Sequence, residues 1–483
     1  MATIKIIDPI TRLEGHLKIE IKVDIVGNTQ QVVDAKSTGT LFRGFEKILV
    51  GRDPQDAQHI TQRICGVCPV PHGMASVLAQ DKAFNVTIPP NARIMRNLVM
   101  GANFIQSHIL HFYHLALQDF VDGPNMPPWQ PSWSTDKQKI SETMATSLVN
   151  NYVEAINMTR KAHELGALFG GRMPDPPAYI AGGFTGFPRA ERITQANSYL
   201  NDLISFTNNV YLPDVEIVGQ AYYEYATIGE GYGNLLAFGA FPRGQNETDN
   251  LFQGGYIQNN STAVKTVDTG LIKEQVRYSW YANSTKNLQP AGGKTKPKYP
   301  KKNAYSWLKA PRYDGNPYEA GPLARMWVNG DYRNGISVMD RHRARAQETL
   351  KIAQSMQTWI SQLTQGGAVY APHNGVVNAI VSGLTEAPRG ALGHWVSLSR
   401  GRIKNYQIIT PTCWNASPRD DKGLSGPIEK ALVGTPVQNI DEPIEVLRVI
   451  HSFDPCLACA VHVARPAEDK KIYGVKGSLG AYA

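Results

Sequence analysis

Two Cys-x-x-Cys pairs stand near opposite ends of this 483-residue chain and constrain its fold more than any other feature. The first pair is Cys65 and Cys68, and the second is Cys456 and Cys459. A spacing of two residues lets both sulfurs of a pair bind one ion, and thiolates are soft ligands that favour zinc, copper(I), iron–sulfur clusters or related transition metals. If all four sulfurs bind one centre, the two ends of the chain must meet in a single folding unit.

The cysteines leave two interpretations open. One is a structural zinc site, although such sites usually stabilise small modules, and a chain of this length can bury a large core without one. The other is a working metal centre, which needs polar neighbours. Arg63 and His72 flank the first pair, and Asp454 and His462 flank the second, which favours the working centre. Cys413, the fifth cysteine, is expected to be a small buried apolar residue.

Composition excludes several classes of protein. Charged residues at 19% and hydrophobic residues at 42% are typical of a folded chain rather than a disordered one. The net charge is +8, but five lysines crowd into residues 292–303, which we expect to be an exposed loop, and no nucleic-acid motif accompanies them. No run approaches the ~18 apolar residues of a membrane span, and the first nine residues do not resemble a signal peptide. We therefore expect neither a nucleic-acid partner nor a membrane span.

Apolar periodicity predicts an α+β fold that is mainly helical, with a central bundle of long helices and small β-sheets. Alternation predicts strands at 17–23 and from 32, joined by a turn at 27–28, and a second sheet within 366–412. Helical spacing predicts long helices at about 91–120, 141–170, 189–209 and 339–364, and a last helix near 426–432 or 444–452.

We expect a single domain, in which the metal site joins the N-terminal and C-terminal segments. Its expected parts are a β region with the first cysteine pair (1–90), long helices (91–210 and 339–364), an irregular α+β excursion (213–335) and a β region with the second pair (366–462).

Further motifs extend the cysteine pattern over almost the whole chain. They are DPITRLEGH at 8–16, TLFRGFE at 40–46, GRDP at 51–54, GGRMP at 170–174, EAPRGALGH at 386–394 and PTCWNASPRD at 411–420. With these motifs, the sequence resembles the large, catalytic subunit of nickel–iron hydrogenases of the uptake or respiratory type, close to the nickel–iron–selenium branch. Cys456 stands where that branch uses selenocysteine, so this chain has the sulfur form.

The resemblance implies a role for each cysteine of the two pairs. Cys65 and Cys456 would be terminal ligands of nickel, whereas Cys68 and Cys459 would bridge nickel to an iron that carries carbon monoxide and cyanide. Cys456 is the expected first proton acceptor, because a terminal thiolate is more basic than a bridging one.

Residues outside the pairs also match family positions. Glu14 matches a glutamate that relays the proton, and Arg389 matches an arginine that lies over the metals and can orient the reacting group. Asp454 would lie close to Arg389 and fix it. Many members have aspartate at the position of Ser107, so the carboxylate pairing around Arg389 differs here.

Three further residues are implied to surround the centre. Pro388 and Thr412 match positions that contact the diatomic ligands of the iron, and His72 would donate a hydrogen bond to a bridging sulfur. A separate set of histidines, three residues apart on the first long helix, spreads too widely for one ion and is expected to serve in packing or hydrogen bonding. These are His108, His111 and His114.

A magnesium site and a cleavage site are implied as well. Glu46, the backbone carbonyl of Ile408 and the imidazole of His462 match the magnesium ligands, although an imidazole is unusual for so hard an ion, and a structural salt bridge is the alternative for Glu46. Family precursors lose a short tail, so the resemblance implies cleavage between His462 and Val463. The catalytic domain would then be 1–462, and 463–483 would be a C-terminal extension that is removed on maturation.

The implied reaction is the reversible splitting of dihydrogen into two protons and two electrons. Beyond the four ligands only Cys413 remains, so electrons must leave through a partner, the iron–sulfur small subunit. The implied further partners are a maturation endoprotease and chaperones that insert nickel and iron. The implied location is periplasmic, membrane-associated through the small subunit, whose twin-arginine signal exports both chains. The alternatives are a hydrogen-sensing relative, a structural subunit of a respiratory complex and the zinc scaffold.

Overall fold

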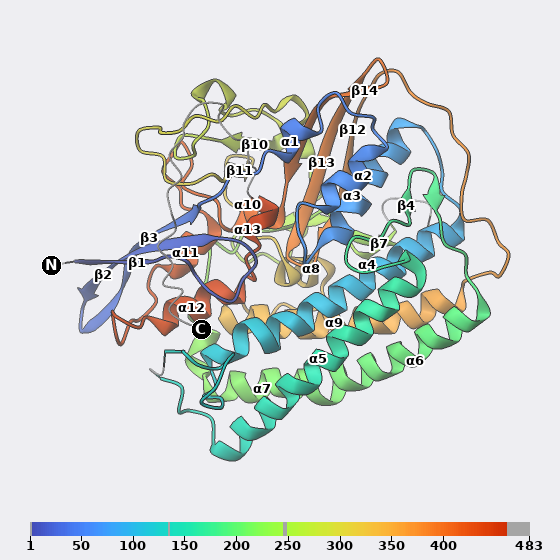
Figure 1. Cartoon of the computed structure of the whole chain (residues 1–483). Helices are drawn as coiled ribbons and strands as arrows, with labels where there is room; N and C mark the ends of the chain where they lie inside the picture. The colour runs from blue at the N-terminus through green and yellow to red at the C-terminus, as the bar shows by residue number, and fades with distance from the viewer. Residues whose placement is uncertain (1, 134–135, 245–248, 461–483) are drawn as a thin grey trace, which may run out of the picture.

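Long helices lie side by side in the lower half of the computed structural model, and small sheets lie above and beside them (Figure 1). The structure describes residues 2–133, 136–244 and 249–460. Four long helices form the bundle, in which α4 and α6 each pack against both α5 and α9. Their bounds are α4 Pro90–Leu110, α5 Glu142–Gly170, α6 Ala190–Phe206 and α9 Val338–Ser361. The predicted α+β fold with a central helical bundle is confirmed.

Local sequence explains where these helices begin and end. Ser141 precedes α5, and its side chain accepts a hydrogen bond from the N–H of Met144, while Gly171 ends the helix with a φ of 86°. At the start of α9, Ser337 and Asp340 form a reciprocal capping box. Both predicted ends of α5 and the predicted start of α9 therefore agree with the structure to within one or two residues.

The first long helix differs from its prediction. The α-helical part ends at Leu110, and the chain continues as a π-helical turn (His111–Ala116) and a short 3-10 turn (Leu117–Asp119). The side chain of Arg12 donates a hydrogen bond to the carbonyl of Leu115 at 2.7 Å. A side chain that takes a helix carbonyl interrupts the regular hydrogen-bond ladder, which explains the wider turn.

Two other predicted boundaries are wrong. The third helix does not stop near residue 209, because a π-helical turn leads directly into α7 (Leu212–Ala221), inside the predicted irregular excursion. The second sheet does not start near residue 366, where its predicted range begins, because its first strand, β12, begins at Ala379. The alternation of apolar and polar residues does not distinguish the segment before β12 from the strand itself. Both candidate last helices exist, as α11 (Pro427–Leu432) and α12 (Ile444–Ser452).

Two three-stranded antiparallel sheets flank the bundle. The N-terminal sheet has the order β1-β2-β3, and the C-terminal sheet has the order β12-β13-β14. In the second sheet the last pair of β12 and β13 is Ala387 with Gly390, so only Pro388 and Arg389 form the turn. The bounds are β1 Thr3–Ile7, β2 Leu17–Val26, β3 Thr29–Gly39, β12 Ala379–Ala387, β13 Gly390–Ser399 and β14 Arg402–Ile409.

The remaining elements are short and connect or cover the bundle and sheets. The short helices are α1 Phe45–Ile48, α2 Asp56–Gln62, α3 Pro69–Ala83, α8 Pro322–Asn329, α10 Pro411–Asn415 and α13 Leu457–Ala460. The short strands are β4 Tyr179–Ile180, β5 Gly183–Phe184, β6 Leu235–Ala237, β7 Ala240–Pro242, β8 Asn250–Phe252, β9 Gly255–Ile257, β10 Ile272–Gln275 and β11 Ala310–Tyr313. Among the described residues, no helix has both the length and the apolar character that a membrane crossing requires.

The lysines of the lysine-rich segment are exposed except for Lys301. Lys301 is half-buried, and its ammonium group donates hydrogen bonds to the carbonyls of Ser279 and Tyr281 at 3.0 and 2.9 Å. The other four lysines of this segment are exposed. Lys301 therefore stabilises the loop rather than contributing to a free basic surface.

The C-terminal sheet packs through Gly383 of β12 against α3, the helix that follows the first cysteine pair. A Cβ at this position would lie 1.9 Å from the carbonyl oxygen of Ala75 in α3. We expect Gly383→Ala to push α3 away and to lower the free energy of unfolding by about 3 kcal/mol, the upper part of the range for overpacking. Denaturant unfolding measures the change. Gly375→Ala is the control, because no atom lies within 4 Å of a Cβ there. Equal stability of the two variants would contradict the prediction.

Candidate metal centre

The four cysteines of the two pairs converge in the interior. Their sulfur atoms all lie within 4.8 Å of one another, and all four residues are buried. The Sγ atoms of Cys65 and Cys456 are 3.3 Å apart, and those of Cys68 and Cys459 are 3.1 Å apart. All four thiols are free of disulfides. Sequence ends that are far apart in the chain therefore meet at one point, as a shared metal centre requires.

The first pair occupies the short connection between α2 and α3. Cys68 directly precedes Pro69, whose fixed φ suits the first position of a helix. The backbone N–H groups of Val67 and Cys68 donate hydrogen bonds to Cys65 Sγ at 3.3 and 3.2 Å. These donors stabilise negative charge on this sulfur.

In the second pair, Cys456 lies between α12 and α13, and Cys459 lies within α13. This part of the chain is joined to the N-terminal segment. Glu14 and Cys456 form a parallel β-bridge, in which the N–H of Leu457 donates to the carbonyl of Glu14 at 2.7 Å. Gly15 has a φ of 87°, and a Cβ there would lie 2.5 Å from the backbone nitrogen of Ala458. Only glycine permits this close approach, which brings the Glu14 side chain beside the sulfurs.

Burial and mutual proximity govern the ionisation of the thiols. Burial raises the pKa of Cys456 and of Cys459 well above the usual value. Burial also opposes ionisation of Cys65, but hydrogen bonds from the neighbouring thiols and the charge of Arg389 outweigh it and lower its pKa. One thiolate therefore forms readily, whereas four buried thiolates need cationic charge among them. Four convergent soft donors fit a thiophilic metal centre such as nickel and iron.

Glu14 is the carboxylic acid that approaches this cluster. Its Oε2 atom lies 3.8 Å from Cys456 Sγ and accepts a hydrogen bond from the N–H of Ala458 at 3.2 Å. Burial and the negative charge of Cys65 raise the pKa of Glu14. The residue also lines a cavity of about 450 Å³ together with His16 and Arg43. Glu14 thus lies between a buried sulfur and an open cavity.

Arg389 lies at the turn between β12 and β13 and is buried. Its Nη2 atom is 2.9 Å from Asp454 Oδ1 in an ion pair, and Nη1 donates to the hydroxyl of Ser107 at 3.4 Å. Burial favours the neutral guanidine, but Asp454 and the cysteine sulfurs raise the pKa of Arg389 well above its ordinary value. The guanidinium is therefore a fixed positive charge close to the thiols.

Three other residues of the predicted site are buried as well. The hydroxyl of Thr412 accepts a hydrogen bond from the N–H of Cys456 at 2.9 Å, and Pro388 is buried beside Arg389. His72, in α3, is buried, and its Nδ1 lies 3.2 Å from Nε2 of His394. His394 in turn lies 2.9 Å from the hydroxyl of Tyr406, so a chain of hydrogen-bonding groups leads from α3 into the C-terminal sheet.

The predicted magnesium ligands are described only in part. Glu46 is buried, its Oε1 accepts a hydrogen bond from the N–H of Ile408 at 2.9 Å, and its Oε2 accepts one from the hydroxyl of Thr295. The carboxylate and the backbone of residue 408 therefore lie together. His462 and Val463, and with them the predicted cleavage site and tail, lie outside the described residues.

The three histidines of the first long helix have separate partners. The Nε2 atoms of His108, His111 and His114 lie 2.8 Å from Glu348 Oε2, 2.6 Å from the carbonyl of His451 and 3.2 Å from the carbonyl of Tyr152. Their predicted use in packing and hydrogen bonding is confirmed. Cys413 is buried at 6% exposure, and burial raises its pKa to about 11, as expected for an inert thiol outside the cluster.

Sequence reasoning missed Arg43, which holds both cysteine segments. Its guanidinium donates to the carbonyls of Arg63 at 2.8 Å, of Ala458 at 3.3 Å and of Ile64. Arg43 therefore links Arg63 and Ile64, which precede the first cysteine pair, to Ala458, which lies between the two cysteines of the second pair. Its place in the motif at 40–46 was the available signal, but its partners are backbone atoms, which leave no trace in side-chain spacing.

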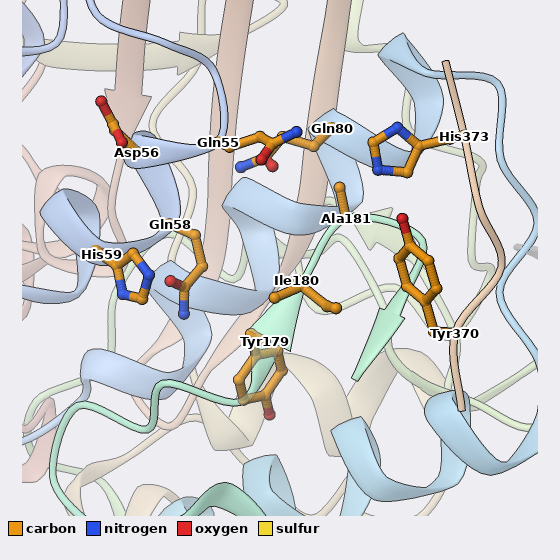
Figure 2. A pocket seen from close by; sticks show the side chains of 10 residues that line it. All are labelled: Gln55, Asp56, Gln58, His59, Gln80, Tyr179, Ile180, Ala181, Tyr370 and His373. Carbon is orange, nitrogen blue, oxygen red and sulfur yellow. The ribbon is translucent and has the colours of Figure 1, made fainter. Parts of the chain in front are cut away.

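A larger cavity lies away from the cysteines. Its volume is about 510 Å³, and Figure 2 shows the ten side chains that line it. They come from α2 and the residue before it, from α3, from β4 and the residue after it, and from the segment before β12. No cysteine is among these ten residues, nor is any other predicted site residue. The size of a cavity is therefore a poor guide to the chemistry here, whereas the convergence of thiols is a direct one.

Comparison with known proteins agrees with this geometry. The family model described as "Nickel-dependent hydrogenase" matches residues 43–127, 123–336 and 330–462, and a model described as "HoxL-like" matches residues 4–35. The periplasmic [NiFeSe] hydrogenase large subunit of Desulfomicrobium baculatum is 42% identical over 95% of this chain and 94% of that protein. The uptake hydrogenase large subunit of Bradyrhizobium diazoefficiens is 34% identical over 95% of each chain.

A solved structure shows the same fold. The Ni-Fe-Se hydrogenase of D. vulgaris Hildenborough in the reduced state superposes with a TM-score of 0.92 at 42% identity, covering 96% of this chain and 100% of that one. The family model, the relatives and the solved structure thus each match nearly the whole length of this chain. The chain belongs to the nickel-dependent hydrogenase family, as a large, catalytic subunit.

Proposed function

We propose that this chain catalyses the reversible cleavage of dihydrogen into two protons and two electrons and passes the electrons to an iron–sulfur small subunit. The observation that carries the proposal is the convergence of four buried thiols from both ends of the chain, with a carboxylic acid and a guanidinium beside them. A closed zinc site needs no such acid and base neighbours.

The four sulfurs divide into two roles. Cys65 and Cys456 are proposed as terminal ligands of nickel, and Cys68 and Cys459 as bridges to an iron that carries carbon monoxide and cyanide. Their buried sulfurs, all within 4.8 Å of one another, support a compact two-metal arrangement. When bound, the nickel–iron centre supplies the Lewis acidity that polarises dihydrogen and the redox chemistry that accepts its two electrons.

The chain itself moves the proton. Cys456 accepts it, since a terminal thiolate retains basic lone pairs, and Glu14 takes it from Cys456 across the 3.8 Å between Sγ and Oε2. The raised pKa of Glu14 suits a group that must hold a proton and release it again. The cavity of about 450 Å³ beside Glu14 receives the proton on its way to solvent.

Arg389 is proposed to orient the reacting group. The ion pair with Asp454 at 2.9 Å holds the guanidinium in place, so that its positive charge needs no rearrangement during the reaction. Pro388 and Thr412 are proposed to contact the diatomic ligands of the iron, and His72 to donate a hydrogen bond to a bridging sulfur.

Glu46, the backbone of Ile408 and His462 are proposed to hold magnesium. Supporting this assignment, the Glu46 carboxylate lies against residue 408 in a buried position. Maturation is proposed to end with cleavage between His462 and Val463 by a dedicated endoprotease, after chaperones have inserted nickel and iron.

The cleavage gives a mass prediction. We expect the active enzyme to lack residues 463–483, because the histidine that binds magnesium is then the last residue. Intact-mass measurement of purified, active protein checks this directly, with the metal-free precursor as the reference. Full activity in a species that still ends at Ala483 would contradict it.

A periplasmic location, with membrane association through the small subunit, is also proposed. A periplasmic relative that is 42% identical supports the first part, and the small subunit is proposed to carry the export signal for both chains.

Turnover separates the enzyme from its non-catalytic alternatives. We expect the purified heterodimer to reduce an artificial electron acceptor continuously under hydrogen, with no acceptor reduction under argon. A hydrogen sensor would bind nickel and iron but show turnover lower by orders of magnitude. Metal-loaded protein without turnover would therefore contradict the proposed catalytic function.

A further inference from the structure

The turn that carries Arg389 is unusual for a hairpin. It has only two residues, Pro388 and Arg389, between the paired residues Ala387 and Gly390, and all four are buried. Two-residue hairpin loops normally adopt primed turns with positive φ, but proline fixes φ near −65° and Arg389 also lacks a positive φ. A buried turn of this kind needs donors for its carbonyl groups and support from outside the hairpin.

Arg325 in α8 supplies both donors. Its Nη1 donates to the carbonyl of Ala387 at 2.9 Å, and its Nη2 donates to the carbonyl of Pro388 at 2.8 Å. The side chain of Arg325 is fully buried. The two residues directly before Arg389 are therefore held by one guanidinium that comes from a different part of the fold.

The guanidinium is itself fixed by two carboxylates. Glu348 accepts from Nε at 2.6 Å and from Nη2 at 2.7 Å, and Glu386 accepts from Nη1 at 2.8 Å. An arginine side chain has five N–H groups, and here each has its own acceptor, three on carboxylates and two on the turn. His108 contacts Glu348, and the N–H of Phe238 donates to Glu386, so the carboxylates are held as well.

The charges of Arg325 and Glu348 are stable near neutral pH. Burial opposes ionisation of Glu348, but Arg325 outweighs it and lowers the pKa of Glu348 to about 2. Burial raises the pKa of Glu386 to about 7 and lowers that of His108 to about 4. The Arg325–Glu348 pair therefore stays ionised near neutral pH, whether Glu386 is protonated or ionised.

We propose that Arg325 is a positioning residue for the hydrogenase reaction, which sets where Arg389 and Pro388 lie relative to the metal centre. It touches neither the sulfurs nor the substrate in this account, and it acts through the backbone of the turn. The inference rests on the proposed function of Arg389 and Pro388. A displacement of about 1 Å in a catalytic group can cost about 100-fold in rate, so a rigid support is needed.

The test is Arg325→Lys in the mature heterodimer. Lysine keeps the positive charge but has three N–H groups, so at least two of the five acceptors lose their donor. We expect the infrared bands of the iron-bound diatomic ligands to shift, because Pro388 moves. We also expect turnover per nickel to fall by about 10- to 100-fold, with the KM for hydrogen little changed.

Arg96→Lys is the matched control. Arg96 is equally buried, pairs with Asp81 at 2.6 Å and donates to the carbonyls of Ile180 and Gly183, but it supports a different hairpin. We expect Arg96→Lys to lose stability while keeping its infrared bands and its turnover per nickel. Wild-type bands and wild-type turnover per nickel in Arg325→Lys would overturn the inference, as would equal changes in the two variants.

If Arg325→Lys cannot be purified with its metals bound, a milder variant provides the test. Glu386→Gln leaves the Arg325–Glu348 pair in place and loosens only one contact. We expect a smaller band shift and a loss of turnover per nickel of about 2- to 10-fold, and unchanged bands with unchanged turnover would overturn the inference. Wild-type protein without diatomic bands and without turnover would instead overturn the proposed function, and the inference with it.

Discussion

Replacement of Cys456 by serine is expected to remove nickel and to lower hydrogen oxidation by at least about 1,000-fold, equivalent to ~4 kcal/mol in the barrier. Cys456 Sγ lies 3.3 Å from Cys65 and 3.0 Å from Cys459, so it contributes to the cluster from two sides. A serine hydroxyl is a hard donor that stays protonated, and it cannot replace a soft thiolate. Metal analysis and turnover on the same preparation measure both losses.

Cys413→Ser is the matched control, because it makes the same chemical change at another buried cysteine. Cys413 lies outside the cluster, and its sulfur accepts a hydrogen bond from the hydroxyl of Thr410 at 3.4 Å and donates to the carbonyl of Ala460 at 3.9 Å. We expect this variant to keep its nickel and its turnover, with a stability loss of about 1 kcal/mol. Nickel binding and turnover in Cys456→Ser equal to those of Cys413→Ser would refute the ligand assignment.

Glu14→Gln is expected to lower turnover by about 100- to 10,000-fold, the range for loss of a general acid–base group. Glutamine has the same shape, and its carbonyl oxygen can still accept the hydrogen bond that Ala458 N–H donates to Oε2 at 3.2 Å. It cannot carry a proton away from Cys456. The metal content and the infrared spectrum should therefore stay at wild-type values while turnover collapses.

Glu14→Asp distinguishes proton transfer from packing. Aspartate restores a titratable carboxyl group but places it farther from Cys456 Sγ, which is 3.8 Å from the native side chain. We expect a rate between those of the wild type and Glu14→Gln. If Glu14→Gln retained wild-type turnover, the relay would have to leave the centre by another route, and the proposed role of Glu14 would be wrong.

The sequence predicted the parts of the fold that depend on local pattern. The long helices α5 and α9 carry regular apolar spacing and strong capping residues, so their bounds could be predicted. The π-helical turn after Leu110 could not, because its cause is the side chain of Arg12, about 100 positions away in the chain. Contacts of this kind are set by tertiary packing rather than by local propensity.

The candidate site, too, could be predicted from the sequence only in part. Cysteine spacing identifies the thiols, since metal ligands must be particular residue types at particular spacings. Arg43 and Arg325 were missed because they bind backbone carbonyls, which every residue has. The five acceptors of Arg325 belong to Glu348 and to the residues from Glu386 to Pro388, and no motif around Arg325 marks it.

Metal analysis combined with infrared spectroscopy tests the central claim most directly, namely that the four convergent thiols hold a nickel–iron centre. The account predicts nickel and iron in equal amounts in the purified protein, together with infrared bands of iron-bound cyanide and carbon monoxide, and the loss of both metals in Cys456→Ser. Stoichiometric zinc without those bands would contradict it and would leave the cysteines as a structural site.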